Sequence, residues 1–213
     1  MSWLDPYIPQ LIDATGVSIA LAVLTTVISS PAGVLLAIIS LAAPRPVAVG
    51  IAWFSWFMRA VPLLVILFFA YYALPSAGLA IDAFQAAVIG FSLSSAAYFL
   101  EVFRGAFAAI PAGQADASRA LGLPGSHYWR RIALPQAMIA ALPPYITIVS
   151  LIVKGSAVAG IITVNELTSV SVGIMALTFR PFEILGLAAL VYLVMSGAVT
   201  ALQFALERVW RHR

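Results

Sequence analysis

Long apolar stretches without a charged residue are the feature that most limits what this chain can fold into. Five runs approach or exceed the roughly 20 residues that an α-helix needs to cross the hydrocarbon core of a bilayer. These runs are Ala14 to Pro44, Ala60 to Ile81, Ala83 to Leu100, Ile132 to Val153 and Ile184 to Leu206. Only 9% of the residues are charged, against about a quarter in a typical soluble domain. The sequence therefore predicts an all-α membrane protein with five transmembrane helices.

The predicted spans belong to a single domain, residues 1–213. They cover residues 15–43, 47–74, 83–107, 132–157 and 184–206, and residues 108–131 form the loop between the third and fourth spans. The second span contains Arg59 and Pro62. A charge at that depth in a membrane is costly and rare. Arg59 therefore either pairs or snorkels within the bundle, or belongs to a gate or a solute path.

The charged residues divide between the two sides of the predicted membrane. One side carries Arg45, Arg104, Arg119, Arg130, Arg131, Arg208, Arg211 and Arg213. The other carries Asp5, Asp13, Asp82, Glu166 and Glu183, with Arg180 and Lys154. Cytoplasmic loops of membrane proteins are enriched in Lys and Arg. The sequence thus predicts an N-terminus outside the cell and a C-terminus in the cytoplasm.

The loop on the arginine-rich side has the punctuation of two short helices separated by a tight turn. Pro111 breaks the preceding helix, and residues 115–121 are rich in helix formers. Gly122 stands where a helix commonly ends in a residue with positive φ, and Pro124 prevents continuation. Ser126 is placed to cap a second short helix that leads into the fourth span. Such a rigid element at the membrane face suits docking to a partner.

This loop matches a known pattern in both residue type and spacing. Asp116-Ala117-Ser118 is followed by three residues, Gly122, nine residues and Ile132-Ala133-Leu134-Pro135. It resembles the EAA loop of permease subunits of ABC importers, which reads Glu-Ala-Ala, three residues, Gly, nine residues, Ile, one residue, Leu-Pro. The resemblance implies the type I importer permease architecture and a coupling helix that docks into an ATP-binding subunit. The residues that it assigns to coupling are Asp116, Ala117, Ser118, Arg119 and Gly122.

Further stretches are similar to the polar amino-acid permeases, the group that includes histidine, glutamine and glutamate importers. They are Phe57 to Leu64, Ser95 to Tyr98, Glu101 to Gly105, Leu134 to Ala137 and Ala141 to Pro144. This resemblance implies a non-enzymatic subunit of an ATP-driven importer in a bacterial inner membrane, with no cofactor in the chain itself. ATP and Mg would bind two partner ABC ATPase subunits. A second permease, either a copy or a paralogue, and an extracytoplasmic solute-binding protein complete the expected assembly, which involves no nucleic acid.

Polar residues near the predicted spans give a candidate solute path. They are Arg59, Ser94, Ser95, Tyr98, Glu101, Lys154 and Ser156. The serines alternatively bond backbone carbonyls or help helices to pack, and the path could belong to the other permease of a heteromeric transporter.

Two departures from the family pattern bear on the solute. The usual Lys-Asp is Lys154-Gly155 here, and a polar Asn-Gln pair is replaced by Thr147-Ile148. A carboxylate at position 155 could hold a cationic solute group in a low-dielectric cavity. Its absence makes a basic amino acid a poorer candidate, and the replaced pair leaves the wall of the path less polar.

Other classes of protein fit the sequence less well. The only lysine precedes Gly155, so the chain lacks the Gly-Lys-Ser/Thr phosphate loop. His127 and His212 are too far apart for a helical zinc motif, and we predict neither a catalytic nor a metal site. A stand-alone secondary transporter or channel is the main alternative, but inverted repeats are not evident and intramembrane acids are scarce. The docking loop argues against this alternative and against a purely structural subunit.

Overall fold

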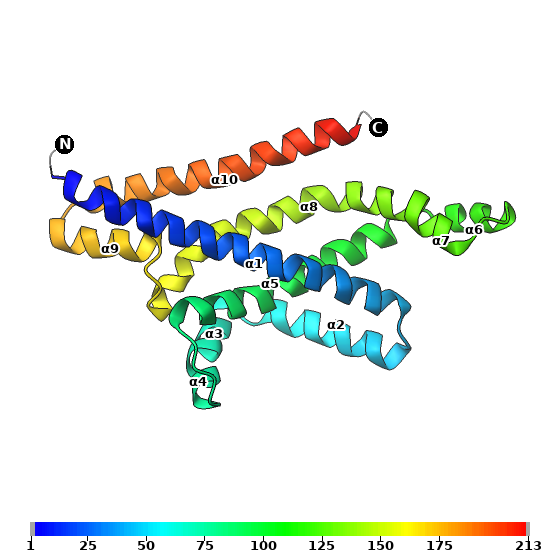
Figure 1. Ribbon diagram of the computed structural model, residues 1–213, viewed down its shortest axis with the longest axis horizontal. Coiled ribbons are helices and arrows are strands. Elements are labelled where there is room, and N and C mark those ends of the chain that lie inside the picture. The colour runs from blue at the N-terminus through cyan, green and yellow to red at the C-terminus, as the bar shows by residue number, and fades with distance from the viewer. Residues whose placement is uncertain (1–2, 212–213) are drawn as a thin grey trace.

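The computed structural model describes the backbone of residues 3–211 and the side chains of residues 3–208, and the fold is a bundle of helices (Figure 1). The longer helices are α1 (Ile8–Ala42), α2 (Arg45–Ala60), α5 (Ala83–Ala108), α8 (Leu134–Gly155), α9 (Leu167–Thr178) and α10 (Pro181–Arg211). The shorter ones are α3 (Leu63–Phe68), α4 (Leu74–Ser76), α6 (Ala112–Ala120) and α7 (Gly125–His127). A π-helical turn, Phe69–Ala73, joins α3 to α4, and another, Tyr128–Ala133, joins α7 to α8. The 3-10 turns Asp5–Tyr7 and Ser156–Ile162 precede α1 and follow α8.

Four helical stretches in residues 3–211 are long and apolar enough to cross a membrane, and a bent pair supplies a fifth. The prediction of an all-α membrane fold with five spans is therefore confirmed, with α2 and the α3–α4 arm counted as one. The second span is not the continuous helix over 47–74 that the sequence suggested, because its two parts meet at a bend of 102°. Pro62 has no N–H and forces the preceding Val61 into an extended conformation. The chain consequently turns at Val61-Pro62.

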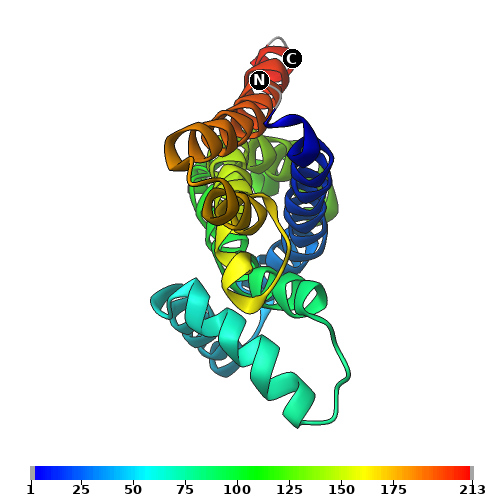
Figure 2. The same ribbon diagram turned by 90° about the vertical axis from the view of Figure 1, so that its left-hand side faces the viewer.

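Helix α5 forms the centre of the bundle. In the most apolar 18-residue window of each helix, 67% of α5 is buried but only 28% of the segment containing α1 and 11% of α10. Figures 1 and 2 show α1 and α8 beside α5, α10 beside α8 and α9, and the α3–α4 arm extending away from them. Large apolar side chains remain exposed on the outer helices, such as Val27 and Val194. In a membrane these surfaces face lipid instead of water.

The backbones of α1 and α5 approach one another closely at Gly33. A Cβ atom added at this glycine would lie 2.5 Å from the Cβ of Phe99 and 2.9 Å from the backbone nitrogen of Leu100. Small residues at such crossings allow van der Waals contact between backbones, which is a major source of helix association in membranes.

Helix α9 is an element that the sequence analysis missed. It has only 12 residues, too few to be noticed as a span. Its N-cap, Glu166, is fully buried and accepts hydrogen bonds from the backbone N–H groups of Thr168 (2.8 Å) and Ser169 (2.7 Å). The hydroxyl of Tyr192 on α10 donates a third bond to Glu166, at 2.9 Å. The carboxylate therefore both starts α9 and joins it to α10.

Replacing Gly33 by alanine tests the close crossing of α1 and α5. We expect Gly33→Ala to lower the free energy of unfolding by about 1–3 kcal/mol, because backbone atoms of α5 must move to admit the methyl group. Gly16→Ala on the same helix is the matched control, since nothing lies within 4 Å of its added Cβ. Thermal unfolding of the detergent-solubilised complex measures both. Equal midpoints for the two variants would contradict the close packing at Gly33.

Candidate functional site

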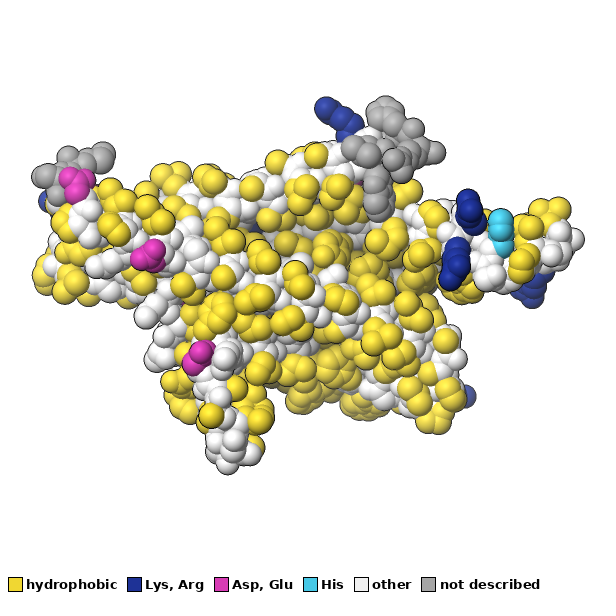
Figure 3. All heavy atoms as spheres, viewed as in Figure 1, with side chains coloured by type: hydrophobic (Ala, Val, Ile, Leu, Met, Phe, Trp, Pro, Cys, Tyr) yellow, Lys and Arg dark blue, Asp and Glu magenta, His cyan; other side chains and the backbone are white. Residues whose placement is uncertain are grey.

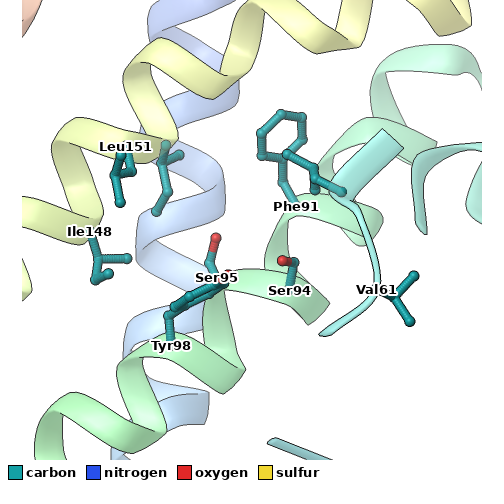
Figure 4. Close-up of a pocket in the computed structure, with 9 residues that line it drawn as sticks. Val61, Phe91, Ser94, Ser95, Tyr98, Ile148 and Leu151 are labelled. Carbon is teal, nitrogen blue, oxygen red and sulfur yellow. The ribbon is translucent and has the colours of Figure 1, made fainter. Parts of the chain in front are cut away.

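A cavity of about 170 Å³ lies between α5, α8 and the break that separates α2 from α3. Its lining consists of Val61, Leu63, Phe91, Ser94, Ser95, Tyr98, Ile148, Leu151 and Ile152. Figure 4 shows α5 contributing one wall and α8 the other, with Val61 on the connecting segment. Three residues of the predicted solute path, Ser94, Ser95 and Tyr98, are thus brought together by their spacing along α5.

The nine lining residues offer three hydroxyl groups and no charged side chain. The wall from α8 is aliphatic and includes Ile148, the position at which the sequence departs from the polar family pattern. Hydroxyl groups can donate and accept hydrogen bonds and so can meet both the carboxylate and the ammonium group of a zwitterion. The cavity therefore suits a small zwitterion, whose positive and negative charges balance one another.

Position 155 lies next to this cavity without lining it. A Cβ added at Gly155 would meet Cε1 of Phe91 at 3.3 Å and Cδ2 of Leu63 at 3.9 Å, and both of these residues line the cavity. A longer side chain here would reach the cavity wall. Because residue 155 is a glycine, no side-chain carboxylate stands where the family pattern described above has one.

The other members of the predicted path lie elsewhere. Lys154 is exposed and does not line the cavity. Ser156 is fully buried, and its hydroxyl donates to the backbone oxygen of Val153 at 2.8 Å. This is the alternative that the sequence allowed for serines, a bond to a nearby backbone carbonyl, here in the last turn of α8.

Arg59 and Glu101 form an ion-pair cluster between α2 and α5 and do not line the cavity. Nη2 of Arg59 lies 3.7 Å from Oε1 of Glu101, which also accepts a hydrogen bond of 2.8 Å from the hydroxyl of Ser55. Nε of Arg104 donates to the second carboxylate oxygen at 3.1 Å. The sequence left open whether Arg59 pairs or snorkels within the bundle or belongs to a gate or solute path. In the structure it pairs with Glu101 within the bundle.

The cytoplasmic loop is a helix with a defined end. After α6, the N–H of Gly122 donates to the carbonyl of Arg119 (2.9 Å), and the N–H of Leu123 donates to the carbonyl of Ser118 (3.1 Å). These two bonds are the Schellman pattern. Gly122 has φ = +67°, so the expected positive φ is confirmed. The expected cap by Ser126 is wrong, because α7 begins after Pro124 and has no side-chain cap.

The predicted coupling residues are divided between the two faces of α6. Asp116 and Arg119 are 70% and 77% exposed and pair with one another at 2.7 Å. Ala117 is exposed, whereas Ser118 is 4% exposed. We expected both small residues to face a partner, but Ser118 faces its own chain because it lies on the opposite side of the helix from that surface.

A pair of glutamines fixes α6 to the start of α8, and the sequence analysis did not predict it. Nε2 of Gln114 donates to Oε1 of Gln136 at 3.0 Å, and Nε2 of Gln136 donates back to Oε1 of Gln114 at 2.8 Å. Gln136 belongs to the family-like stretch Leu134 to Ala137 (Leu-Pro-Gln-Ala), and this was the feature of the sequence that could have pointed to the pair. The reciprocal bonds connect the short helix directly to a membrane span.

Comparison with known families decides what this arrangement is. Residues 29–212 match the family described as "Binding-protein-dependent transport system inner membrane component". The chain belongs to this family of transporter permeases. As members of an ABC transporter family, such permeases work with ATPase and binding-protein partners.

Similar proteins agree with this assignment. The permease is 40% identical over 159 residues to "Probable amino-acid ABC transporter permease protein YckA" of Bacillus subtilis (strain 168), which covers 73% of this chain and 69% of the relative. It is 31% identical over 220 residues to "Histidine/lysine/arginine/ornithine transport system permease protein HisM" of Escherichia coli (strain K12), covering 98% and 90%.

A solved structure shares the fold of the permease. It is described as "Crystal structure of an amino acid ABC transporter with histidines", has 29% sequence identity and a TM-score of 0.89, and is matched over 96% of both chains. The type I importer architecture that the sequence implied is thereby confirmed.

The Glu101 cluster gives a test of the link between α2 and α5. We expect Glu101→Gln to lower the free energy of unfolding by about 1–2 kcal/mol, because Arg59 and Arg104 both lose their counter-ion. The matched control is Glu183→Gln, which breaks a half-exposed pair of 3.6 Å with Arg180 within one helical turn and should cost less than about 1 kcal/mol. Thermal unfolding of the solubilised complex measures both. Equal losses of unfolding free energy in the two variants would show that the Glu101 cluster does not stabilise the contact between α2 and α5.

Proposed function

We propose that the permease translocates an amino acid with an uncharged side chain, or a similar zwitterion, into the cytoplasm. The observation that carries this proposal is the cavity beside α5, whose lining residues offer hydroxyl groups without a charged side chain. The α-ammonium and α-carboxylate of an amino acid can bond the hydroxyls of Ser94, Ser95 and Tyr98. A charged solute side chain would need an opposite charge in this low-dielectric environment.

The relatives support an amino-acid solute of some kind. The names of YckA and HisM and the description of the solved structure all refer to amino-acid transport. HisM is named for several basic amino acids, whereas Gly155 leaves this permease without the carboxylate that such solutes would favour. The relatives therefore indicate the class of solute, and the cavity favours its uncharged members.

The proposed assembly has two permeases, two ABC ATPase subunits and an extracytoplasmic binding protein. Helix α6 docks into a groove of an ATPase subunit, which binds ATP and Mg. The exposed Asp116–Arg119 pair and Ala117 supply the contact surface. The Schellman turn at Gly122, which leads on to α7, and the glutamine pair transmit movement of α6 to α8, because neither connection can bend freely. Residues 109–111 connect α6 directly to α5.

We propose that the end of the bundle carrying α6 and α7 faces the cytoplasm of a bacterium. On the face shown in Figure 3, Lys and Arg side chains gather at that end, and Asp and Glu side chains lie toward the end that carries α9. The positive-inside rule supports this orientation. Of the C-terminal arginines, Arg208 is exposed, the side chain of Arg211 is not described, and Arg213 lies outside the described residues.

A carboxylate at position 155 tests the choice of solute. We expect Gly155→Asp to increase the ratio of arginine uptake to glutamine uptake by roughly tenfold, because one well-placed ion pair in a low-dielectric site is worth about 1.4 kcal/mol or more. Gly155→Asn, which has the same shape without the charge, is the control. ATP-driven uptake of both labelled amino acids into proteoliposomes with the cognate ATPase and binding protein is the measurement. An unchanged ratio in Gly155→Asp would place the solute away from this cavity.

The orientation has its own test. A reporter enzyme that is active only outside the cytoplasm should be active when inserted after Ser76 in the α3–α4 arm and inactive when fused after Arg213. A fluorescent protein that folds only in the cytoplasm should give the reverse pattern at the same two sites. Reversed activities at both sites would overturn the proposed orientation.

A further inference from the structure

A groove of about 400 Å³ opens between the end of α1, the end of α5 and the turn that leads into α8, well away from the solute cavity. Its walls are apolar and include Leu41, Phe107 and Leu134, and Trp129 and Arg130 complete one side. The rings of Phe107 and Trp129 meet edge to face with centroids 6.0 Å apart. The groove therefore combines an apolar channel, an amphipathic ring and one cation.

The guanidinium of Arg130 is available to a ligand. Arg130 is exposed, and within the side chains of residues 3–208 no carboxylate lies within ion-pair distance of it. Arginine suits phosphate because its planar fork can donate two parallel hydrogen bonds. A phosphate with attached hydrocarbon would satisfy the cation and the apolar wall together.

The level of the groove in the membrane matches this chemistry. Helix α1 ends at Ala42, α5 ends at Ala108 and α8 begins at Leu134, so three helices leave or enter the hydrocarbon at this height. Tryptophan is enriched at such boundaries, and basic pockets between helix ends on the cytoplasmic side are typical sites for anionic headgroups. The assignment to the cytoplasmic leaflet depends on the orientation proposed above.

We propose that this groove is a binding site for an anionic phospholipid of the cytoplasmic leaflet. Its phosphate lies against Arg130, and the first part of an acyl chain lies along Leu41, Phe107 and Leu134. Because the site joins α1 to the segment that follows α6 and α7, bound lipid would brace the membrane end of the coupling loop.

The test compares two neighbouring arginines in the assembled transporter. The complex with its ATPase subunits is placed in nanodiscs of phosphatidylcholine with increasing phosphatidylglycerol, and lipid retained after mild detergent extraction is counted by native mass spectrometry. We expect Arg130→Gln to weaken retention of phosphatidylglycerol roughly tenfold. Arg131→Gln is the matched control, because this exposed arginine is outside the groove lining and should change retention by less than about twofold.

A second variant keeps the cation and fills the groove. Ala42 lines the groove, and Ala42→Trp should also displace phosphatidylglycerol while ATPase subunits still copurify. Equal losses in Arg130→Gln and Arg131→Gln, or equal retention of phosphatidylcholine and phosphatidylglycerol by the unaltered complex, would overturn the proposal. A photoreactive residue introduced at Leu41 gives an independent check. Crosslinking of this residue to a second permease or to an ATPase subunit, and not to lipid, would also overturn the proposal. Uptake by the same variants in proteoliposomes separates this result from the proposed function, which does not require the lipid.

Discussion

The contact between α1 and α5 at Gly33 leaves no room for a side chain, and much of the bundle is arranged around the helix that this contact holds. Inside a membrane, lipid solvates apolar side chains as well as a protein does, so helices associate chiefly through close packing and polar bonds. Helix α5 uses both. Its Gly90 lies against Leu67 of α3. The rings of Phe99 and of Tyr145 on α8 have centroids 4.9 Å apart. Glu101 accepts a hydrogen bond of 2.8 Å from the hydroxyl of Ser55 on α2.

The same helix connects the successive levels of the proposed transport path. Its middle section carries the hydroxyl groups of the cavity, one turn further on it carries Glu101, and soon after its end comes α6. A displacement of α6 therefore acts on a helix that also lines the cavity. The glutamine bonds between α6 and α8 provide a second connection to the opposite wall. Both walls of the cavity are thus linked to α6.

The sequence predicted the fold well where long-range composition or local backbone preference decides the outcome. Charge-free runs locate the spans because a bilayer imposes a minimum length, and Gly122 predicts its turn because positive φ favours glycine. Pro62 was visible in the sequence, but the size of the bend at Val61 depends on packing against α5 and could not be read from it. Helix α9 and the Gln114–Gln136 pair depend on contacts between distant segments, which composition does not reveal.

The candidate site shows the same division. Spacing along one helix brought Ser94, Ser95 and Tyr98 together, since these residues share a face of α5. Lys154 was grouped with them by polarity alone, although it is exposed and does not line the cavity. The role of Gly155 depends on its distance from Phe91 and Leu63, and a sequence contains no distances between helices.

The buried carboxylate of Glu166 restricts how the end of the bundle that carries α9 can rearrange. Separating α9 from α10 would remove the Tyr192 hydroxyl from a fully buried acid, which is expensive in a low-dielectric interior. The α3–α4 arm meets the turn after α8 through apolar packing and a long hydroxyl pair, Tyr71 with Thr163 at 3.5 Å. Apolar surfaces can slide without leaving a charge unpaired. A rearrangement at this end of the bundle would therefore cost least beside the arm, with α9 and α10 kept together.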